Sequence, residues 1–547
     1  MAEAERLPNP VQDDFVAMPI EPILLLAPPG CGKTEALAIR ASGLVSSGHV
    51  PPPCRLLALT FSRKARDGLR KRVREELGRA RADRKVTVHN FHGFSARVIN
   101  AHGSLLGYGD DTVMPDRRWA RSQLSTMTDV RGEIEESLKL IREIKQRHVD
   151  DSAVAAAVEA SANPLVRELE MRRLAEHRLE FDDLVRTALQ LLSVDGVRRL
   201  YRLHFSGVLV DEMQDMTLQQ LELALAIGAG RTTLAGDNAQ GIYTFAGAEP
   251  EAVVARFERE EPRIFVLSEN YRSAPRIIAL VSAMAKTLGG DGVSCAAPDE
   301  WSTEGEVRIL RFSSLENEAS EILAMAQRLL AADPSLSVGV LARVHFRKRL
   351  IEEVADDLGL EFECWDRAVD SPSVRTILRR CAERVPATGG AQAFDLLEEL
   401  CLAECPPEDV DLRDGLLQGM DVVRELCSSG VSLGKVVSSL SVRSDEVVSP
   451  GLHFLNAHVG KGQQFDWVIV LGMEDDFIPG YRAATEEELQ EELRVLHVMC
   501  SRARLGLLFT VCRDVRWDPD REWPRDESRW LERLKRFTTG NGDPTLP

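Results

Sequence analysis

The sequence predicts an α/β protein with two parallel-sheet cores, each interrupted by a helical insertion. Short apolar runs end in turn or polar residues and alternate with helical stretches, a pattern typical of parallel strands joined by crossover helices. These runs form two series along the chain, and one long stretch with helical periodicity breaks each series. With 547 residues, of which 44% are hydrophobic, the chain is long enough for several packed cores.

The expected elements divide the chain into six segments. Strands of the first series are expected at 23–27, 56–60, 208–210 and 232–235, and strands of the second at 307–311, 338–342, 452–455, 468–471 and 505–511. The first core is expected at 1–104 and 176–285 with its insertion at 105–175, and the second at 286–366 and 448–547 with a shorter insertion at 367–447.

Composition disfavours several classes of protein. The amino-terminal segment MAEAERLPNP lacks the layout of a secretion signal, and no apolar run approaches the roughly 18 residues of a membrane span. A cytoplasmic protein without a membrane partner is therefore expected. The ten cysteines include no C-x-x-C pair, which argues against a zinc ribbon or a disulfide framework. We expect free thiols, because the cysteine-rich stretch 364–427 also lacks the usual spacing of a metal cluster.

Charge is distributed unevenly along the chain. The net charge of −18 disfavours a protein that simply coats nucleic acid, since phosphate binding needs a positive surface. Between Arg63 and Lys85, however, eleven Lys or Arg residues stand against four acidic residues. This basic stretch is either a solvated helix face or a phosphate-binding surface, and the sequence does not decide between the two.

The first expected strand runs directly into the loop APPGCGKT and then into a helical stretch. In such a loop, backbone N–H groups and a helix N-terminus cradle phosphates, Lys33 reaches the β and γ oxygens, and the Thr34 hydroxyl binds Mg²⁺. The pattern departs by one residue, because Ala27 stands where a glycine is usual. The expected nucleotide-binding residues here are Ala27, Pro28, Pro29, Gly30, Cys31, Gly32, Lys33, Thr34 and Glu35. The loop predicts ATP and Mg²⁺ as cofactors.

An acidic pair follows the third expected strand. Asp211 suits the Mg²⁺ shell together with Thr34, and Glu212 can orient or deprotonate the attacking water. Such a pair is also common as a helix N-cap. Its presence together with the phosphate loop favours the catalytic interpretation.

The box DEMQD at 211–215 and the blocks around it resemble superfamily 1A helicases of the UvrD/PcrA/Rep family, in a compact form. The other blocks are TFSRKA (60–65), NFHG (90–93), EFDDL (180–184), GDNAQGIYTFAGA (236–248), NYRS (270–273), HVGKGQQF (458–465), EELR (491–494) and SRA (501–503). The resemblance implies two RecA-like P-loop NTPase cores, each a parallel sheet flanked by helices and each carrying a helical insertion. It also implies an ATP-dependent DNA helicase that moves 3′ to 5′ on single-stranded DNA.

The resemblance implies roles for individual residues. The expected hydrolytic residues are Lys33, Thr34, Asp211, Glu212, Gln240 as γ-phosphate sensor, and the arginine fingers Arg272 and Arg502. The expected contacts to adenine and ribose are Gln12, Tyr271 and Gln464. The expected single-strand contacts are Thr60, Phe61, Lys64, His92, Phe245, Arg343 and His458. Plain core packing is the alternative for Phe61 and Phe245. Two positions depart from the family: Phe245-Ala246 replaces Trp-Arg, and Gln464 replaces Glu.

Three functions are compatible with these patterns. The leading one is a free-standing repair or replication helicase that acts on single-stranded DNA next to duplex. Because the second insertion is shorter than in the best-known members of the family, the alternative is a helicase subunit of a nuclease-helicase antiviral defence complex such as Gabija, which acts through a nuclease partner. A P-loop ATPase unrelated to nucleic acid is the third, and it requires every DNA-contact block to be a packing coincidence.

Overall fold

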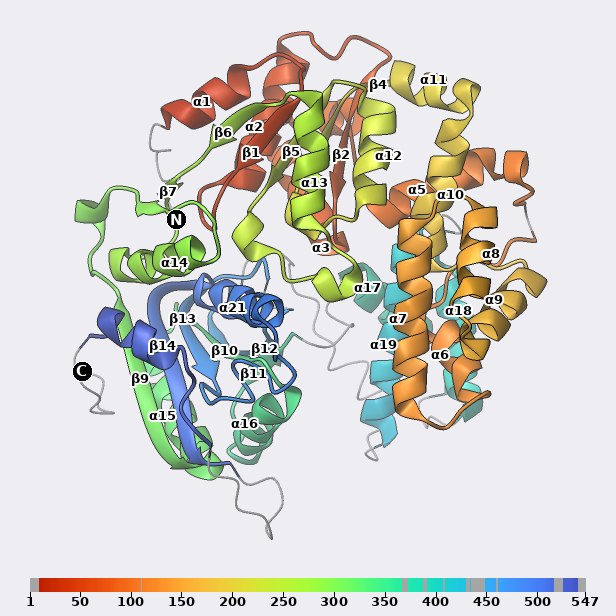
Figure 1. Ribbon diagram of the computed structural model, residues 1–547. Coiled ribbons are helices and arrows are strands. Elements are labelled where there is room, and N and C mark those ends of the chain that lie inside the picture. The colour runs from red at the N-terminus through yellow and green to blue at the C-terminus, as the bar shows by residue number, and fades with distance from the viewer. Residues whose placement is uncertain are drawn as a thin grey trace.

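The protein contains two six-stranded parallel sheets, which confirms the predicted α/β class. The structure is a computed structural model that describes residues 9–109, 111–365, 372–386, 391–406, 409–428, 433, 448–458, 461–515 and 525–539. In Figure 1 the first sheet lies at the top and the second at the lower left, with two groups of helices beside them. A hollow lined by residues of both cores lies between them.

The first sheet has the strand order β3-β2-β4-β5-β1-β6. Its strands are β1 (Ile23–Leu26), β2 (Arg55–Thr60), β3 (Val86–Asn90), β4 (Phe205–Val210), β5 (Thr232–Gly236) and β6 (Arg263–Val266). Successive side chains point to opposite faces, so Ile23 and Leu56 enter one hydrophobic cluster while Leu24 and Leu57 enter another. Burial on both faces explains why the central strands of this sheet read as continuous apolar runs.

Helices cover both faces of the first sheet. They are α1 (Pro10–Ala17), α2 (Lys33–Ser46), α3 (Arg63–Leu77), α4 (Arg79–Lys85), α5 (Phe91–His102), α10 (Phe181–Ser193), α11 (Asp195–His204), α12 (Leu218–Gly228) and α13 (Pro250–Phe257). The helix α14 (Pro275–Thr287) follows the small sheet of β7 (Glu269–Asn270) and β8 (Ser294–Cys295). It packs against α21 (Glu486–Cys500) of the second core, although the expected boundary at 285 places most of it in the first.

The second sheet has the order β11-β12-β10-β13-β14-β9. Its strands are β9 (Glu306–Ser314), β10 (Ser337–Ala342), β11 (Phe362–Cys364), β12 (Gly451–Asn456), β13 (Phe465–Leu471) and β14 (Ala503–Asp514). Besides α21, its helices are α15 (Leu315–Ala332), α16 (His345–Asp357) and α22 (Leu531–Leu534). As in the first sheet, alternate side chains enter two clusters: Val340 lies on one face and Leu341 on the other.

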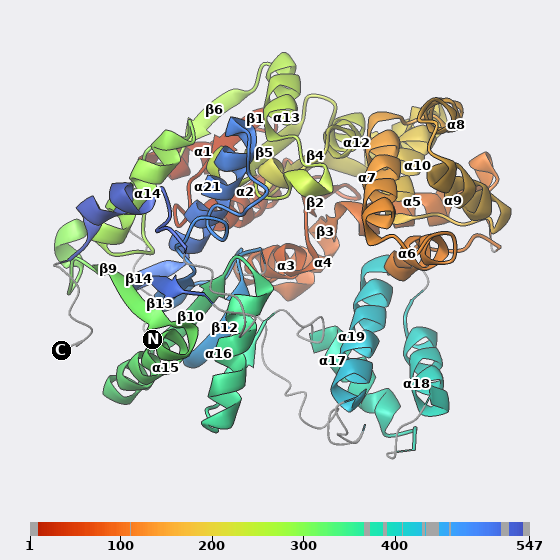
Figure 2. The ribbon, with the colours of Figure 1, turned by 60° about the horizontal axis from the view of Figure 1, so that its bottom comes forward.

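Two helical groups lie side by side next to the cores (Figures 1 and 2). The first contains α6 (Arg117–Ser125), α7 (Arg131–Arg147), α8 (Asp151–Ala160) and α9 (Pro164–Ala175), and the second contains α17 (Pro372–Ala382), α18 (Ala391–Ala403) and α19 (Val410–Ser428). Arg118 on α6 pairs with Glu398 on α18 at 3.0 Å and with Asp421 on α19 at 3.2 Å. Arg117 pairs with Asp414 at 2.9 Å. These ion pairs join the two groups.

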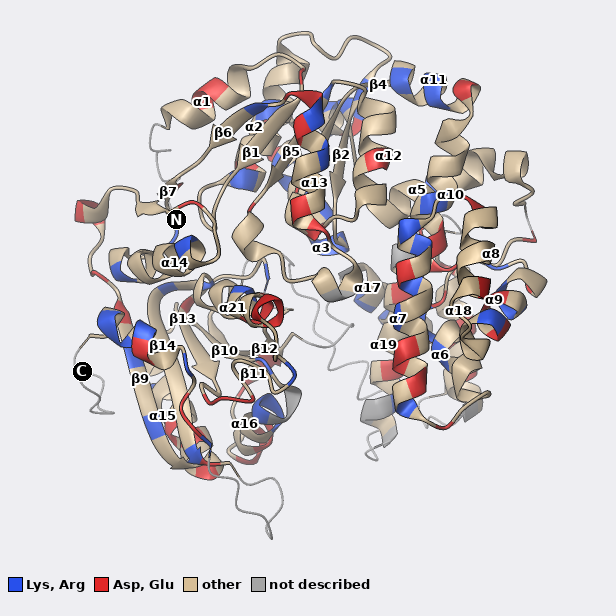
Figure 3. Ribbon diagram, in the orientation of Figure 1, with Lys and Arg blue, Asp and Glu red and all other residues tan. Residues whose placement is uncertain are grey.

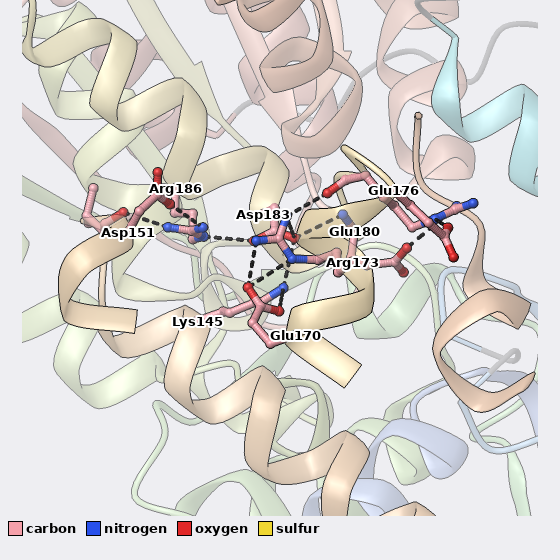
Figure 4. A network of polar contacts seen from close by, with 10 residues as sticks. Lys145, Asp151, Glu170, Arg173, Glu176, Glu180, Asp183 and Arg186 are labelled. Carbon is pink, nitrogen blue, oxygen red and sulfur yellow. Dashed lines mark hydrogen bonds and ion pairs between the residues drawn. The ribbon is translucent and has the colours of Figure 1, made fainter. Parts of the chain in front are cut away.

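A buried network of charged side chains attaches the first helical group to α10 (Figure 4). Its buried members are Lys145, Glu170, Arg173, Asp183 and Arg186, and exposed Asp151 pairs with Arg186 at its edge. Lys145 Nζ lies 2.8 Å from Asp183 and 3.1 Å from Glu170, and Arg186 Nε lies 2.9 Å from Asp183. Removal of one member would leave a buried charge uncompensated, so the network holds α7 and α9 in place. Elsewhere charges of both signs are spread over the surface, as along α7 (Figure 3).

Glu180 lies beside this network, and it makes the stability of the fold depend on pH. Burial raises the pKa of Glu180 from 4.5 to about 8, although Lys145 and Arg178 oppose the rise. Because this pKa is higher in the folded than in the unfolded state, the protonated carboxyl stabilises the fold. Its contribution to the free energy of unfolding is complete below pH 4.5 and is lost as the pH rises through 8. We predict that the thermal midpoint of the protein falls over this range relative to that of Glu180→Gln, which cannot ionise. The control is Glu159→Gln, on the exposed end of α8, which should follow the unmodified protein at every pH. A difference in thermal midpoint between the protein and Glu180→Gln that does not change with pH would contradict the prediction.

Candidate active site

The phosphate loop joins β1 to α2 and is held against the NYRS block. Gly30 and Gly32 have φ of +76° and +78°, a left-handed backbone that glycine adopts without strain. Asn270 Nδ2 donates to the carbonyl of Pro29 at 2.6 Å, and the backbone N–H of Tyr271 donates to that of Gly30 at 3.1 Å. A Cβ on Gly30 would lie 2.3 Å from Asn270 Nδ2, so this close approach requires glycine.

A cation, a hydroxyl and two carboxylates meet at the carboxyl ends of β1 and β4. Lys33 Nζ lies 2.7 Å from Glu212 and 3.5 Å from Asp211, and the Thr34 hydroxyl donates to Asp211 at 2.9 Å. Burial acts to raise the pKa of Glu212, but neighbouring Lys33 lowers it to about 2. Burial raises the pKa of Asp211. The set offers a cation for phosphate and hard oxygen ligands for Mg²⁺.

Two guanidinium groups approach this centre, one from each core. Arg502 is buried and donates to the Gln240 side chain at 3.0 Å, and Arg272 donates to the Ser501 carbonyl at 3.5 Å. With its amide oxygen turned toward Arg272, Gln464 accepts from it at 3.0 and 3.2 Å. Neither arginine has a carboxylate partner within the described residues. Burial lowers the pKa of Arg272 to about 10 and that of Arg502 to about 9, so both cations lack the anion that would stabilise them.

The residues expected to contact adenine lie beside the loop. The Asn9 side chain caps α1 by accepting from the backbone of Gln12 at 3.1 Å, and it donates to the Tyr271 hydroxyl at 3.1 Å. That hydroxyl donates to Glu269 at 2.7 Å. Gln12 is buried, and its Nε2 lies 3.6 Å from the position of a Cβ on Gly32. The first helix, the loop and the NYRS block therefore come together at one end of the site.

The remaining loop residues differ in exposure. Ala27, Pro28, Pro29 and Cys31 are buried. Burial raises the pKa of the Cys31 thiol well above its usual range, so the thiol stays protonated. The Glu35 side chain is 46% exposed and lies 3.7 Å from Arg72 of α3, which places it at the outer edge of the site.

Lys461, to which the family resemblance assigns no role, bridges the two cores. Lys461 of the second core lies 2.6 Å from Asp215 of the first and donates to the Gln240 carbonyl at 2.8 Å. Burial raises the pKa of Asp215 to about 6, against the effect of Lys461. Asp215 lies in the block DEMQD and Lys461 in the block HVGKGQQF, so the sequence marks each residue separately but not their contact. Their pairing over 246 positions follows only from the docking of the cores.

A hollow of about 450 Å³, here called the cleft hollow, extends from the carboxylates toward the expected single-strand contacts. Its lining includes Thr34, Asp211, Glu212, Phe61, Lys64, Lys71, Tyr243 and Lys461. The rings of Phe61 and Tyr243 lie 4.9 Å apart, and Lys64 Nζ lies 4.8 Å from the ring centre of Trp365. Phe61 and Lys64 therefore share one hollow with the carboxylates of Asp211 and Glu212.

The other expected single-strand contacts are placed differently. Arg343 pairs with Glu492 at 2.7 Å within the second core. Burial, with a smaller effect of Arg343, lowers the pKa of half-buried His458 to about 4, so its ring is neutral. His92 is half-buried on α5, and Thr60 is fully buried at the end of β2. None of these four lines the cleft hollow.

The loop that carries Phe245 is attached to α7. Its side chain lies outside the described residues, and its backbone belongs to the short helix η4 (Thr244–Ala246). Gln146 Nε2, next to the buried network, donates to the Ala246 carbonyl at 3.1 Å. The first helical group therefore bonds directly to the loop that also positions Tyr243.

Two further expectations concern metals and membranes. None of the ten cysteines forms a disulfide, and the described residues contain no group of three or more His, Cys, Asp or Glu side chains arranged for a metal ion. Among the helices of the described ranges, none combines the length and the apolar character needed to cross a membrane.

Comparisons with known proteins cover both cores. The model of the UvrD/REP helicase N-terminal domain matches residues 8–260, and that of the UvrD-like helicase C-terminal domain matches 433–514. ATP-dependent DNA helicase UvrD2 of Mycobacterium tuberculosis is 27% identical, with 97% of this chain and 82% of the relative covered. ATP-dependent DNA helicase Rep of Escherichia coli is 24% identical, with 96% and 95% covered. The chain therefore belongs to the UvrD/Rep family of helicases, as its motifs predict.

Proposed function

We propose that this helicase hydrolyses ATP to move 3′ to 5′ along single-stranded DNA and to separate strands at junctions with duplex, in DNA repair or replication. One observation carries the proposal: half-buried Arg272 and buried Arg502, one from each core, lie near Glu212 and have no carboxylate partner among the described residues. A polyphosphate bound there would supply the missing anion. The relatives are named ATP-dependent DNA helicases, and the direction follows from the family resemblance.

The residues of the centre have complementary tasks in hydrolysis. Lys33 and the loop bind the phosphates, and Glu212 takes the proton of the attacking water. Thr34 and Asp211 offer a hydroxyl and a carboxylate that fit Mg²⁺, which when bound neutralises phosphate charge. Arg272, Arg502 and Gln240 stabilise the charge on the γ-phosphoryl group. Gln12, Tyr271 and Gln464 bind the nucleoside.

Closure of the cleft couples hydrolysis to movement. Arg502 and Lys461 belong to the second core, yet they bond to Gln240 and Asp215 of the first. Hydrolysis therefore requires the closed arrangement, and product release permits opening. Phe61 and the other expected single-strand contacts are carried by both cores, so opening and closing would shift a strand held across them.

The test is the steady-state ATPase rate with and without single-stranded DNA, beside unwinding of duplexes tailed at either end. We expect stimulation by the single strand and unwinding from a 3′ tail, with Arg502→Ala inactive in both assays. An ATPase that ignores single strands would refute the nucleic-acid motor, and unwinding from a 5′ tail alone would refute the direction. Stimulation without unwinding would limit the isolated chain to translocation and assign strand separation to a complex with a partner such as a nuclease.

A further inference from the structure

A second cavity lies at the β3 edge of the first sheet. This cavity, here called the edge pocket, has a volume of about 660 Å³ and is lined from β2, β3, β4, α3, α4, α5 and α11. Figure 2 shows α3 and α4 beside β3 at this edge. It shares no lining residue with the cleft hollow. Its volume falls within the range of small-molecule sites, about 300–1,000 Å³.

Positive charge dominates the lining of the edge pocket. Its arginines are Arg55, Arg70, Arg74 and Arg97, and Asp83 is its one carboxylate. Asp83 is already paired with Arg74 at 2.8 Å. Arg97 is exposed and, among the described residues, has no ion pair. Burial, together with four nearby arginines, lowers the pKa of His89 to about 3. The pocket therefore favours an anion.

Part of the wall of the edge pocket is aromatic. The Tyr201 ring stacks on Phe205 with centroids 6.3 Å apart and meets Phe94 and His102 edge-on at 5.9 and 5.8 Å. These rings hold Tyr201 in place, and it remains half-buried. Its hydroxyl has no hydrogen-bond partner in the described part of the chain. A planar group could stack on this wall while an attached anion reaches the arginines.

We propose that the edge pocket binds a nucleotide, with its phosphate at Arg97 and Arg70 and its base against Tyr201. A chain of hollows leads from the active site to this pocket. Lys71 lines both the cleft hollow and a hollow of about 500 Å³, and Arg70 and Arg74 line both that hollow and the edge pocket. The nucleotide comes either from solution or from a strand that passes along α3, and both sources present the same phosphate and base.

The edge pocket also explains the basic stretch that the sequence leaves undecided. The stretch Arg63–Lys85 forms α3 and α4, and five of its residues line the pocket: Arg70, Val73, Arg74, Ala82 and Asp83. Of the basic residues on these helices, Arg70 and Arg74 line the cavity. This placement favours phosphate binding over a merely solvated face.

The binding test uses calorimetric titration of thymidine 5′-monophosphate into the full chain, with ADP and Mg²⁺ saturating the active site. We expect one nucleotide per chain and a loss of affinity of about tenfold in Arg97→Ala, because hydrogen bonds to charged groups contribute this much. Arg84→Ala removes an equal charge from exposed α4 without touching the pocket and should bind normally. Absence of binding, or an equal loss in both variants, would overturn the proposal.

Tyr201 separates a nucleotide site from a simple anion site. Tyr201→Leu should weaken binding of the nucleotide but not of inorganic phosphate, whereas Tyr201→Phe keeps the ring and should bind normally. Unchanged thermal unfolding and ADP affinity establish that the variants fold. If inorganic phosphate binds as tightly as the nucleotide and Tyr201→Leu weakens neither, the nucleotide assignment is wrong.

A competition experiment distinguishes the two sources of the nucleotide. An oligothymidylate that displaces the mononucleotide identifies a strand as the ligand, and simultaneous binding of both identifies the free nucleotide. Neither arm depends on ATP hydrolysis or unwinding. Failure of the helicase proposal would therefore leave this test intact, and failure of this test would leave the helicase proposal intact.

Discussion

Replacement of Arg502 by alanine is expected to lower the ATPase rate by about 10³- to 10⁵-fold while nucleotide affinity stays nearly unchanged. Its guanidinium is buried, bonds to the Gln240 side chain, and has no carboxylate to neutralise it in the described structure. A cation in that position interacts most strongly with the charge that develops during phosphoryl transfer. Single-turnover hydrolysis and equilibrium binding of a fluorescent ATP analogue measure the two quantities separately.

Two further variants sharpen this test. Arg504→Ala removes an arginine two positions away that is 53% exposed and pairs with Asp466, so it should leave hydrolysis unchanged. Arg502→Lys keeps the charge but loses the planar fork and should remain strongly impaired. If nucleotide affinity fell as far as turnover in Arg502→Ala, the residue would be a binding group and its assignment as an arginine finger would be wrong.

The central strands of both sheets were predictable because they are buried on two faces. The expected runs at 23–27, 56–60, 338–342 and 468–471 correspond to β1, β2, β10 and β13. The sequence alone predicts no strand at β3, β6 or β11. These strands lie toward the sheet edges, where one neighbour is missing and polar residues are tolerated, as with His89 in β3 and Arg263 in β6. Apolar periodicity is therefore weakest there.

The candidate site was predictable only where it is local in sequence. The loop before Lys33 and the acids after β4 carry recognisable spacing, and the structure brings them within hydrogen-bonding distance. The pairing of Lys461 with Asp215 depends on how the cores dock, which no local pattern encodes. The edge pocket likewise combines α3 and α5 with α11, which lies about 100 residues further along the chain. Its arginines were visible in the sequence, but their arrangement around Tyr201 was not.

Replacement of Lys33 by alanine is expected to abolish hydrolysis, with a loss of at least about 10³-fold, and to weaken ATP binding as well. Lys33 bonds to Glu212 and lowers its pKa, so its loss leaves buried Asp211 and half-buried Glu212 without their nearest cation. One of them would then take up a proton, and the pair could no longer serve both Mg²⁺ binding and water activation.

Lys71→Ala is the matched control for this change, since Lys71 lines the same hollow but its side chain is 48% exposed. It should retain hydrolysis, and circular dichroism should show both variants folded. Hydrolysis at the normal rate in Lys33→Ala would remove Lys33 from the catalytic centre. Because Arg502→Ala should spare ATP binding whereas Lys33→Ala should not, the two variants together separate binding of the nucleotide from its hydrolysis.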